Sequence, residues 1–97
     1  MKKIIWSPKA IASLGRLIKF LDNKWEKKVG DGLLSEIDKA VERISKNPFL
    51  YPLYSKKKNI RKCLVKKRTL LFYRATSAEI LILLFVDARQ NPKNFNF

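Results

Sequence analysis

Two arginines and a dense run of positive charge are the residues of this chain best suited to chemistry. Arg74 lies at the end of one expected strand, and Arg89 lies two residues beyond the next, within the segment 87–92. A guanidinium can hold a phosphate through two parallel hydrogen bonds, whereas a lysine acts as a point charge. Two alternatives follow for Arg89: it binds an anion, or it pairs with Asp87 and shapes the terminal turn.

The positive charge of the chain is concentrated in one region. The sequence has 22 Lys and Arg against 8 Asp and Glu, a formal net charge of +14, and there is no acidic residue between Glu42 and Glu79. Eight residues form what we call the basic run: Lys56, Lys57, Lys58, Arg61, Lys62, Lys66, Lys67 and Arg68. Such a surface attracts RNA, DNA or a strongly acidic protein. The alternative is that these side chains are solvated and keep a small sheet from pairing edge to edge.

The composition argues against several other chemistries. The chain has no histidine, which removes the usual general base and the commonest metal ligand, so no metal site is expected. The single cysteine, Cys63, excludes an internal disulfide and is expected to be a small buried residue in a reducing compartment. Asp87 and Glu79 bracket one expected strand and cannot form a carboxylate pair. With three glycines the chain has no glycine-rich phosphate loop, and no cofactor is expected.

Several aromatic residues lie close to the basic ones in the sequence. Nucleic-acid bases could stack on such rings, but aromatic residues equally complete a hydrophobic core, so both interpretations stay open. The set comprises Tyr51, Tyr54, Tyr73, Phe95 and Phe97.

The length and the apolar pattern predict one domain over residues 1–97. The N-terminal apolar stretch is too short for a signal peptide. The longest apolar run, residues 80–86, has seven residues, far below the roughly 20 needed for a membrane span. We therefore expect a cytoplasmic protein that does not bind membranes.

A short strand and two amphipathic helices are predicted in the first half of the chain. Residues 2–6 are predicted as the strand, and Ser7 is the expected N-cap of a helix with Pro8 at its first position. Apolar residues then recur at helical spacing from 11 to 25, and Lys27 and Lys28 are expected in the last turn.

The second predicted helix begins after a break at residues 29–32, where two glycines interrupt the pattern. It carries a second apolar stripe and ends at Asn47-Pro48. With a short connection, the two helices form an antiparallel hairpin. Residues 48–58 are predicted as a connecting loop.

Three strands are predicted in the second half: Ile60–Val65, Thr69–Ala75 and Glu79–Asp87. Alternation places residues 80, 82, 84 and 86 on one face of the last strand and residues 81, 83 and 85 on the other. Because both faces are apolar, this strand is expected to be central, with the helices on one face and the chain's own tail or a partner on the other. The predicted class is α+β, with the order β-α-α-β-β-β and a helical hairpin packed on a twisted antiparallel sheet.

The order of these motifs along the chain resembles the RelE/ParE toxins of type II toxin–antitoxin systems. The resemblance spans nearly all of the sequence. The tail is similar to members of the ParE-like and plasmid-stabilisation branch of that superfamily. The resemblance rests on Trp6-Ser7-Pro8-Lys9-Ala10, the helix through Leu14, Ile18 and Leu21, Asn47-Pro48, Ile60-Arg61-Lys62, Leu71-Phe72-Tyr73-Arg74, and Asp87-Ala88-Arg89-Gln90-Asn91-Pro92.

The resemblance implies a fold, a partner and two alternative targets. The fold is like that of microbial RNases, and the partner is an acidic antitoxin that wraps and neutralises the toxin. ParE-like members inhibit DNA gyrase, whereas RelE-like members cut mRNA in the ribosomal A site. The tail of this chain is more similar to the ParE-like branch. A nucleic-acid-binding module without toxicity is the third alternative.

The resemblance also suggests roles for particular residues. If the chain is a ribonuclease, Arg89, Lys66 and Arg61 are the candidate catalytic residues on the scissile phosphate. The tail offers Phe95 and Phe97 where RelE-like nucleases often carry a proton-transferring Tyr or His, so catalysis ranks second. The candidate residues for binding a nucleic acid or another target are Lys57, Lys58, Lys62, Lys67, Arg68 and Arg74.

Overall fold

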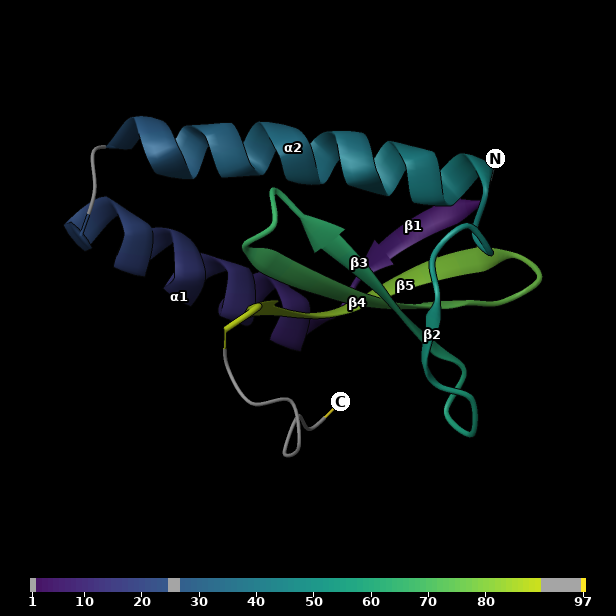
Figure 1. Cartoon of the computed structure of the whole chain (residues 1–97). Helices are drawn as coiled ribbons and strands as arrows, with labels where there is room; N and C mark the ends of the chain where they lie inside the picture. The colour runs from purple at the N-terminus through teal and green to yellow at the C-terminus, as the bar shows by residue number, and fades with distance from the viewer. Residues whose placement is uncertain (1, 25–26, 90–96) are drawn as a thin grey trace.

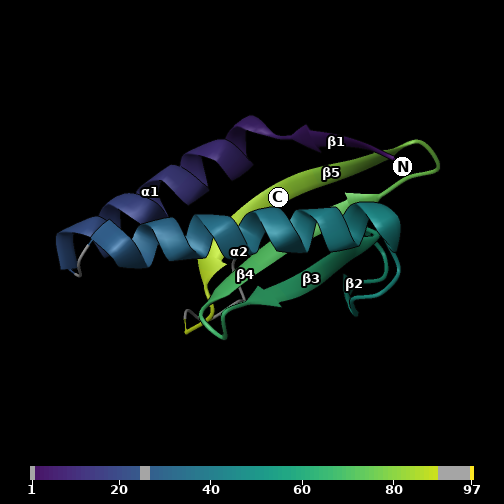
Figure 2. The same cartoon turned by 90° about the horizontal axis from the view of Figure 1, so that it is seen from above.

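A helical hairpin lies across one face of a five-stranded sheet (Figure 1). This computed structural model describes residues 2–24, 27–89 and 97, with side chains described for 2–21, 32–89 and 97. Seen from above, the two helices meet at their connected ends, which extend beyond the sheet, and splay apart over the strands (Figure 2). None of the described helices is long and apolar enough to cross a membrane.

The predicted α+β class and the helical hairpin are confirmed. The sheet order is β1-β5-β4-β3-β2; β1 runs parallel to β5, and the other neighbours are antiparallel. The three strands predicted in the second half are confirmed at both ends. The elements are β1 (Lys3–Trp6), α1 (Pro8–Lys24), α2 (Lys27–Lys46), β2 (Leu53–Ser55), β3 (Ile60–Val65), β4 (Thr69–Ala75) and β5 (Glu79–Asp87).

The predicted break at residues 29–32 is wrong, because α2 already begins at Lys27 and contains both glycines. Lys27 and Lys28 therefore lie in the first turn of α2, not in the last turn of α1. Each glycine costs a helix only about 1 kcal/mol relative to alanine. That cost is outweighed because α2 buries an apolar face against the sheet: Leu33, Ile37, Ala40 and Ile44 are at most 2% exposed.

The prediction of a simple loop over residues 48–58 is also wrong, because it contains the edge strand β2. This strand has three residues and pairs with β3 through an irregular register between Leu53 and Ser55. Pro52 precedes it and accepts a hydrogen bond from the Lys62 N–H at 3.1 Å. So short a strand beside a proline leaves no alternating pattern to detect, and proline is tolerated only at such an edge.

The strand β5 is central, as predicted, but its two faces exchange at a β-bulge. Tyr73 pairs with Ile82 and Phe72 with Leu84, so Leu83 is an extra residue in β5. The prediction that residues 80, 82, 84 and 86 share one face is therefore wrong beyond Ile82. Phe85 joins the core under the helices, and Leu84 packs on the opposite face.

The sheet face opposite the helices carries a second, smaller core. Ile60 and Phe72 are fully buried there, and Leu84 is 7% exposed. The rings of Tyr54 and Phe97 cover Phe72, with centroids 4.9 Å and 5.1 Å from its own. Phe97 thus confirms the expectation that the tail contributes to this cover, and both rings complete a core. Phe95 lies outside the described residues.

The helix α1 covers the part of β5 that β1 does not reach. The pairing of β1 with β5 stops at Trp6 and Ile82, which leaves the next residues of β5 without a strand on that side. The Ser7 hydroxyl donates to the Leu83 carbonyl at 3.1 Å and accepts from the Ala10 N–H at 2.9 Å, which confirms the predicted N-cap. Ser13, only 5% exposed, accepts from the Phe85 N–H at 3.0 Å.

Replacing Gly15 by alanine is expected to raise the free energy of unfolding by about 1 kcal/mol, since alanine is the better helix former. Gly15 lies on the exposed side of α1, and a Cβ there would meet no atom within 4 Å. Urea denaturation followed by circular dichroism measures the change. Gly32→Ala is the matched comparison and should give a similar gain, because its Cβ would lie 3.4 Å from Lys66 Nζ, an ordinary contact with the end of a flexible side chain. An unchanged or lower midpoint for Gly15→Ala contradicts this account.

Candidate functional site

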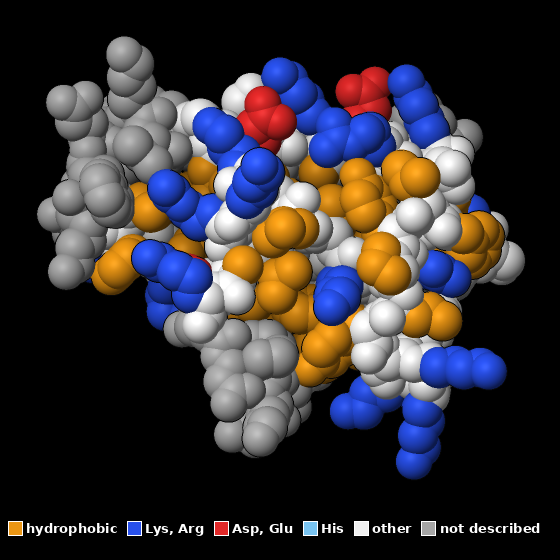
Figure 3. Space-filling model, in the orientation of Figure 1, with side chains coloured by type: hydrophobic (Ala, Val, Ile, Leu, Met, Phe, Trp, Pro, Cys, Tyr) orange, Lys and Arg blue, Asp and Glu red, His pale blue; other side chains and the backbone are white. Residues whose placement is uncertain are grey.

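The basic run does not form one surface, because β3 separates it into two clusters. The six residues of β3 span roughly 17 Å. At one end the exposed β2–β3 turn carries Lys56, Lys57 and Lys58, and Arg74 Nε donates to the Lys58 carbonyl at 3.0 Å. Lysine and arginine side chains project from the lower right of the molecule, where the β2–β3 turn lies (Figures 1 and 3). We call the three lysines of this turn, with Arg74, the first basic cluster.

The second basic cluster consists of Lys66, Lys67 and Arg68 in the β3–β4 turn. The turn lies beside the end of β5, since the Ala88 N–H donates to the Arg68 carbonyl at 2.7 Å. Arg89 therefore lies at the same end of the sheet. Of the remaining basic residues of β3, Lys62 faces away from the helices, next to Phe72 of β4, and Arg61 belongs to the other end of the strand.

The backbone of the second cluster is strained. Lys66 and Lys67 have φ angles of 53° and 57°, and the Arg68 N–H donates to the Val65 carbonyl at 3.1 Å. Two successive positive φ values define a type I′ turn, which favours Asn-Gly and costs a lysine about 1–2 kcal/mol per residue. Backbone strain of this kind is common at functional sites, so the turn is a candidate binding site. Lys66 Nζ itself lies against α2, beside Gly32.

Arg61 anchors the loop before β2. Its Nη1 donates to the Tyr51 carbonyl at 2.7 Å, and its guanidinium carbon lies 5.0 Å from the centre of the Phe49 ring. Its Nε is buried without a hydrogen-bond partner. Arg61 and Lys66 lie near opposite ends of β3, so the structure does not bring the three candidate catalytic residues into one site.

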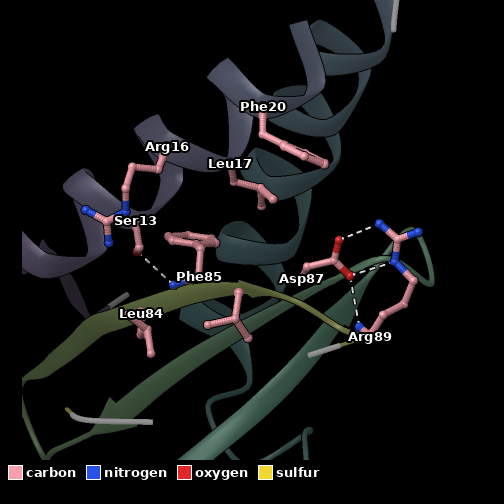
Figure 4. Close-up of a pocket in the computed structure, with 9 residues that line it drawn as sticks. Ser13, Arg16, Leu17, Phe20, Leu84, Phe85, Asp87 and Arg89 are labelled. Atoms are coloured by element: carbon pink, nitrogen blue, oxygen red, sulfur yellow. Dashed lines mark hydrogen bonds and ion pairs between the residues drawn. The ribbon is translucent and has the colours of Figure 1, made fainter. Parts of the chain in front are cut away.

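Arg89 is paired with Asp87 at the end of β5, which confirms the structural alternative raised by the sequence (Figure 4). Arg89 donates through Nε to Oδ1 at 3.0 Å, through Nη2 to Oδ2 at 2.7 Å, and through its backbone N–H to Oδ1 at 2.9 Å. The side chain of Asp87 is 15% exposed and that of Arg89 is 77% exposed. Asp87 thus fixes a guanidinium that faces solvent, and Nη1 takes no part in the pair.

The pair shifts the pKa values of both groups in the direction that favours their charged forms. Hydrogen bonds from the Arg89 side chain hold the pKa of Asp87 below its usual value, against the opposing effect of burial. The same hydrogen bonds raise the pKa of Arg89. Both groups are therefore charged at neutral pH.

Asp87→Asn is expected to remove an acid-sensitive part of the stability. A carboxyl with a lowered pKa contributes stability above its unfolded pKa, about 3.9, and that contribution is lost as pH falls through the folded pKa. Urea midpoints of the wild type and Asp87→Asn should differ at pH 7 and converge as the pH falls below the folded pKa of Asp87. Asp38→Asn removes an exposed carboxylate from α2 and is the control. A constant gap between wild type and Asp87→Asn across the range would show that the pair is not its cause.

Tyr73 and Cys63 are poorly placed to transfer a proton to a substrate. Tyr73 is 0% exposed and donates its hydroxyl to the Pro48 carbonyl at 2.7 Å, and burial raises its pKa to about 12. Cys63 is buried, as predicted, and burial raises the pKa of its thiol. Among the described residues, no three of His, Cys, Asp and Glu are grouped so as to hold a metal ion.

A groove lies between α1 and the end of β5, and no local sequence signal indicated it. Its volume is about 580 Å³. Leu17 and Phe20 point from α1 toward β5, with Asp87 and Arg89 opposite them (Figure 4). It was missed because its two walls are some seventy positions apart in the chain. The described residues that line it are Ser13, Arg16, Leu17, Phe20, Leu84, Phe85, Val86, Asp87 and Arg89.

A basic α+β domain with a helical hairpin on one sheet face and arginines around the end of its central strand is typical of the RelE/ParE class. The comparison with protein families is more specific. The family described as "ParE toxin of type II toxin-antitoxin system, parDE" matches residues 4–92. The chain belongs to this ParE toxin family. A sequence search of curated proteins gives no match.

Solved structures share the fold at low sequence identity. A chromosomal ParDE TA system from P. aeruginosa is 17% identical with a TM-score of 0.75, over 90% of this chain and 96% of that one. YafQ from E. coli strain BL21(DE3) is 14% identical with a TM-score of 0.60, over 91% and 94%. The conserved hypothetical protein HP0894 from Helicobacter pylori is 20% identical with a TM-score of 0.55, over 93% and 98%. At these identities the likeness establishes the fold.

Proposed function

We propose that this protein is a ParE-like toxin that arrests growth when free, is neutralised by an acidic antitoxin, and acts by binding its target. DNA gyrase is the target we favour. The observation that carries the proposal is the solvent-facing guanidinium of Arg89, fixed by Asp87 beside the strained turn of the second basic cluster. A charged group oriented in this way is suited to recognition. The toxin would act in the cytoplasm, where gyrase lies.

An antitoxin partner is supported by charge and by likeness. A net charge of +14 favours association with a partner of opposite sign. The ParDE TA system of P. aeruginosa is similar in fold over nearly the whole chain. Both support a small acidic partner for this protein.

The second candidate is a ribosome-dependent mRNA interferase of the RelE-like branch. It is favoured because Arg89 lies at the same end of the sheet as Lys67 and Arg68. Positive charge there could stabilise the negative charge that develops on a phosphate while its bond is cleaved. The buried Tyr73 and the paired Asp87 count against it, because general acid–base help typically supplies about 10²–10⁴-fold in rate.

Induced expression in a host lacking the antitoxin separates the candidates. We expect growth arrest together with a change in DNA supercoiling, whereas translation and mRNA integrity decline only later. Codon-phased mRNA cuts in toeprints of translating ribosomes, before any change in supercoiling, would instead identify an interferase. Normal growth with soluble protein present would leave a nucleic-acid-binding module without toxicity. Co-expression of the product of the adjacent reading frame should restore growth.

A further inference from the structure

The outer edge of β3 is covered by another strand only near its beginning. β2 lies beside that part of β3 and pairs with Ile60 and Arg61 (Figure 2). Pro52, just before β2, accepts the hydrogen bond from the Lys62 N–H but has no N–H of its own to donate to the Lys62 carbonyl. Beyond Lys62, no strand in the described part of the chain pairs with this edge.

Leu64 directs its backbone polar groups to this open edge. In an antiparallel ladder, the N–H and carbonyl of every second residue point to the same neighbouring strand. Because the Lys62 N–H points to the β2 side, the N–H and carbonyl of Leu64 point there too, away from β4. Among the described residues, no backbone carbonyl of a loop or turn accepts from the Leu64 N–H. The edge therefore offers an acceptor, a donor and a second acceptor to an added strand.

An apolar pocket adjoins the open edge. Its volume is about 240 Å³, and the described residues that line it are Tyr51, Pro52, Lys62, Leu64 and Leu70. Leu64 and Leu70 lie directly opposite each other on the sheet face away from the helices, and Leu64 is 53% exposed. The pocket is smaller than the roughly 300–1,000 Å³ of a site for a drug-sized ligand, so it suits a single apolar side chain.

We propose that the open edge of β3 at Leu64 binds an extended segment of the toxin's target protein as an added strand. One apolar side chain of that segment fills the pocket beside Leu64 and Leu70. A neighbouring carboxylate of the same segment pairs with Lys62. This inference rests on the proposed function, because it names where the target is held and in which conformation.

The open edge is continuous with the candidate target site. The strained turn of the second basic cluster begins at Lys66, two residues after Leu64, and Arg89 lies at the same end of the sheet. A segment that pairs with Leu64 and continues past the end of β3 brings its next residues to that cluster. Backbone pairing then supplies affinity, whereas the pocket and the charges select the sequence that binds.

The charges near this edge favour a partner that is both acidic and apolar. Lys62 is exposed at the pocket, and Lys67 is exposed in the turn that follows. A second copy of this chain would bring another +14 charge to these lysines, so two copies repel. A nucleic acid could bind the lysines, but it lacks the regular N–H and carbonyl pattern that pairs with a strand edge.

Substitutions of Leu64 and Lys62 in the full-length protein test the proposal, with purified DNA gyrase as the probe. Leu64→Pro and Leu64→Ala both lose the leucine side chain, but only the proline variant also loses the outward N–H, at an edge where the β3–β4 ladder does not use it. Lys62→Glu is compared with Lys19→Glu, the same charge change at an exposed position of α1. Calorimetry gives the dissociation constants, and urea midpoints show that each variant is folded. Leu64→Asp replaces the proline variant if the latter does not fold.

We expect Leu64→Pro to weaken gyrase binding by roughly tenfold or more, and by more than Leu64→Ala does. Lys62→Glu should also weaken it by roughly tenfold, and Lys19→Glu should stay within about twofold. Raising the salt from about 0.15 M to about 0.5 M should shrink the effect of Lys62→Glu but not that of Leu64→Pro, because salt screens only the charge interaction.

The edge is not the target site if the wild type binds gyrase and the Leu64 and Lys62 variants bind it equally well; the proposed function then survives. The proposal is also wrong if these variants change only self-association in sedimentation, only binding to random DNA and RNA, or only binding to the purified product of the adjacent reading frame. If the wild type does not bind gyrase, the favoured target fails together with this inference.

Discussion

Replacing Phe72 by alanine is expected to lower the free energy of unfolding by about 3–5 kcal/mol. Phe72 is 0% exposed although it lies on the sheet face that no helix covers. Truncation leaves a cavity between Ile60, Leu84 and the rings of Tyr54 and Phe97, which cannot close it without moving the sheet. Domains of this size have only about 5–15 kcal/mol of stability in total, so the variant should lose a large part of its stability and unfold at a lower temperature.

Leu64→Ala is the control for this prediction. Leu64 lies on the same sheet face, on the neighbouring strand β3, but it is 53% exposed. Its truncation removes little buried surface and should cost well under about 1 kcal/mol. Urea denaturation of both variants, followed by tryptophan fluorescence, measures the difference. Equal midpoints would mean that the second core contributes little to stability.

The strands of the second half could be predicted because every local signal agreed. In β3, β4 and β5, stretches rich in apolar and β-branched residues lie between short polar turns. The pattern therefore fixed both the type and the ends of each strand, and its apolar character on both faces correctly predicted that β5 is central.

The start of α2 and the faces of β5 could not be predicted, because both depend on contacts between distant residues. A glycine penalty is visible in the sequence, but the burial of Ile37 and Ile44 that overrides it is not. The bulge at Leu83 depends on how β5 registers against Phe72 and Tyr73 of β4. A shift of one residue moves every later side chain to the other face.

The candidate site shows the same division between local and distant contacts. The Arg89–Asp87 pair joins residues two positions apart and was therefore open to prediction. The basic run is one cluster in the sequence, yet its two ends lie at opposite ends of the strand β3. The groove joins Arg16 to Arg89, and the packing of α1 on β5, with hydrogen bonds such as that from Phe85 to Ser13, brings those walls together.

Arg61 and Arg89 are both candidate catalytic residues by sequence. We expect Arg61 to contribute mainly to stability and Arg89 mainly to toxicity. Arg61→Ala should lower the free energy of unfolding by about 1–3 kcal/mol, because it leaves the Tyr51 carbonyl without its charged donor and removes packing on Phe49. Arg89→Ala should lower the urea midpoint at pH 7 only slightly, by no more than the loss of its pair with Asp87 costs, since its side chain is 77% exposed.

The effects of the two substitutions on toxicity should be the reverse of their effects on stability. Arg89→Ala removes the oriented guanidinium and is expected to relieve growth arrest at equal amounts of soluble protein. Arg61→Ala should stay toxic in proportion to its folded fraction, and lowering the growth temperature should restore its effect as that fraction rises. Plating efficiency after induction, with soluble protein measured by immunoblot, provides both readouts. If folded Arg61→Ala is harmless while Arg89→Ala still arrests growth, the target is bound at the Arg61 end of β3, because the second basic cluster and Arg89 lie at the other end.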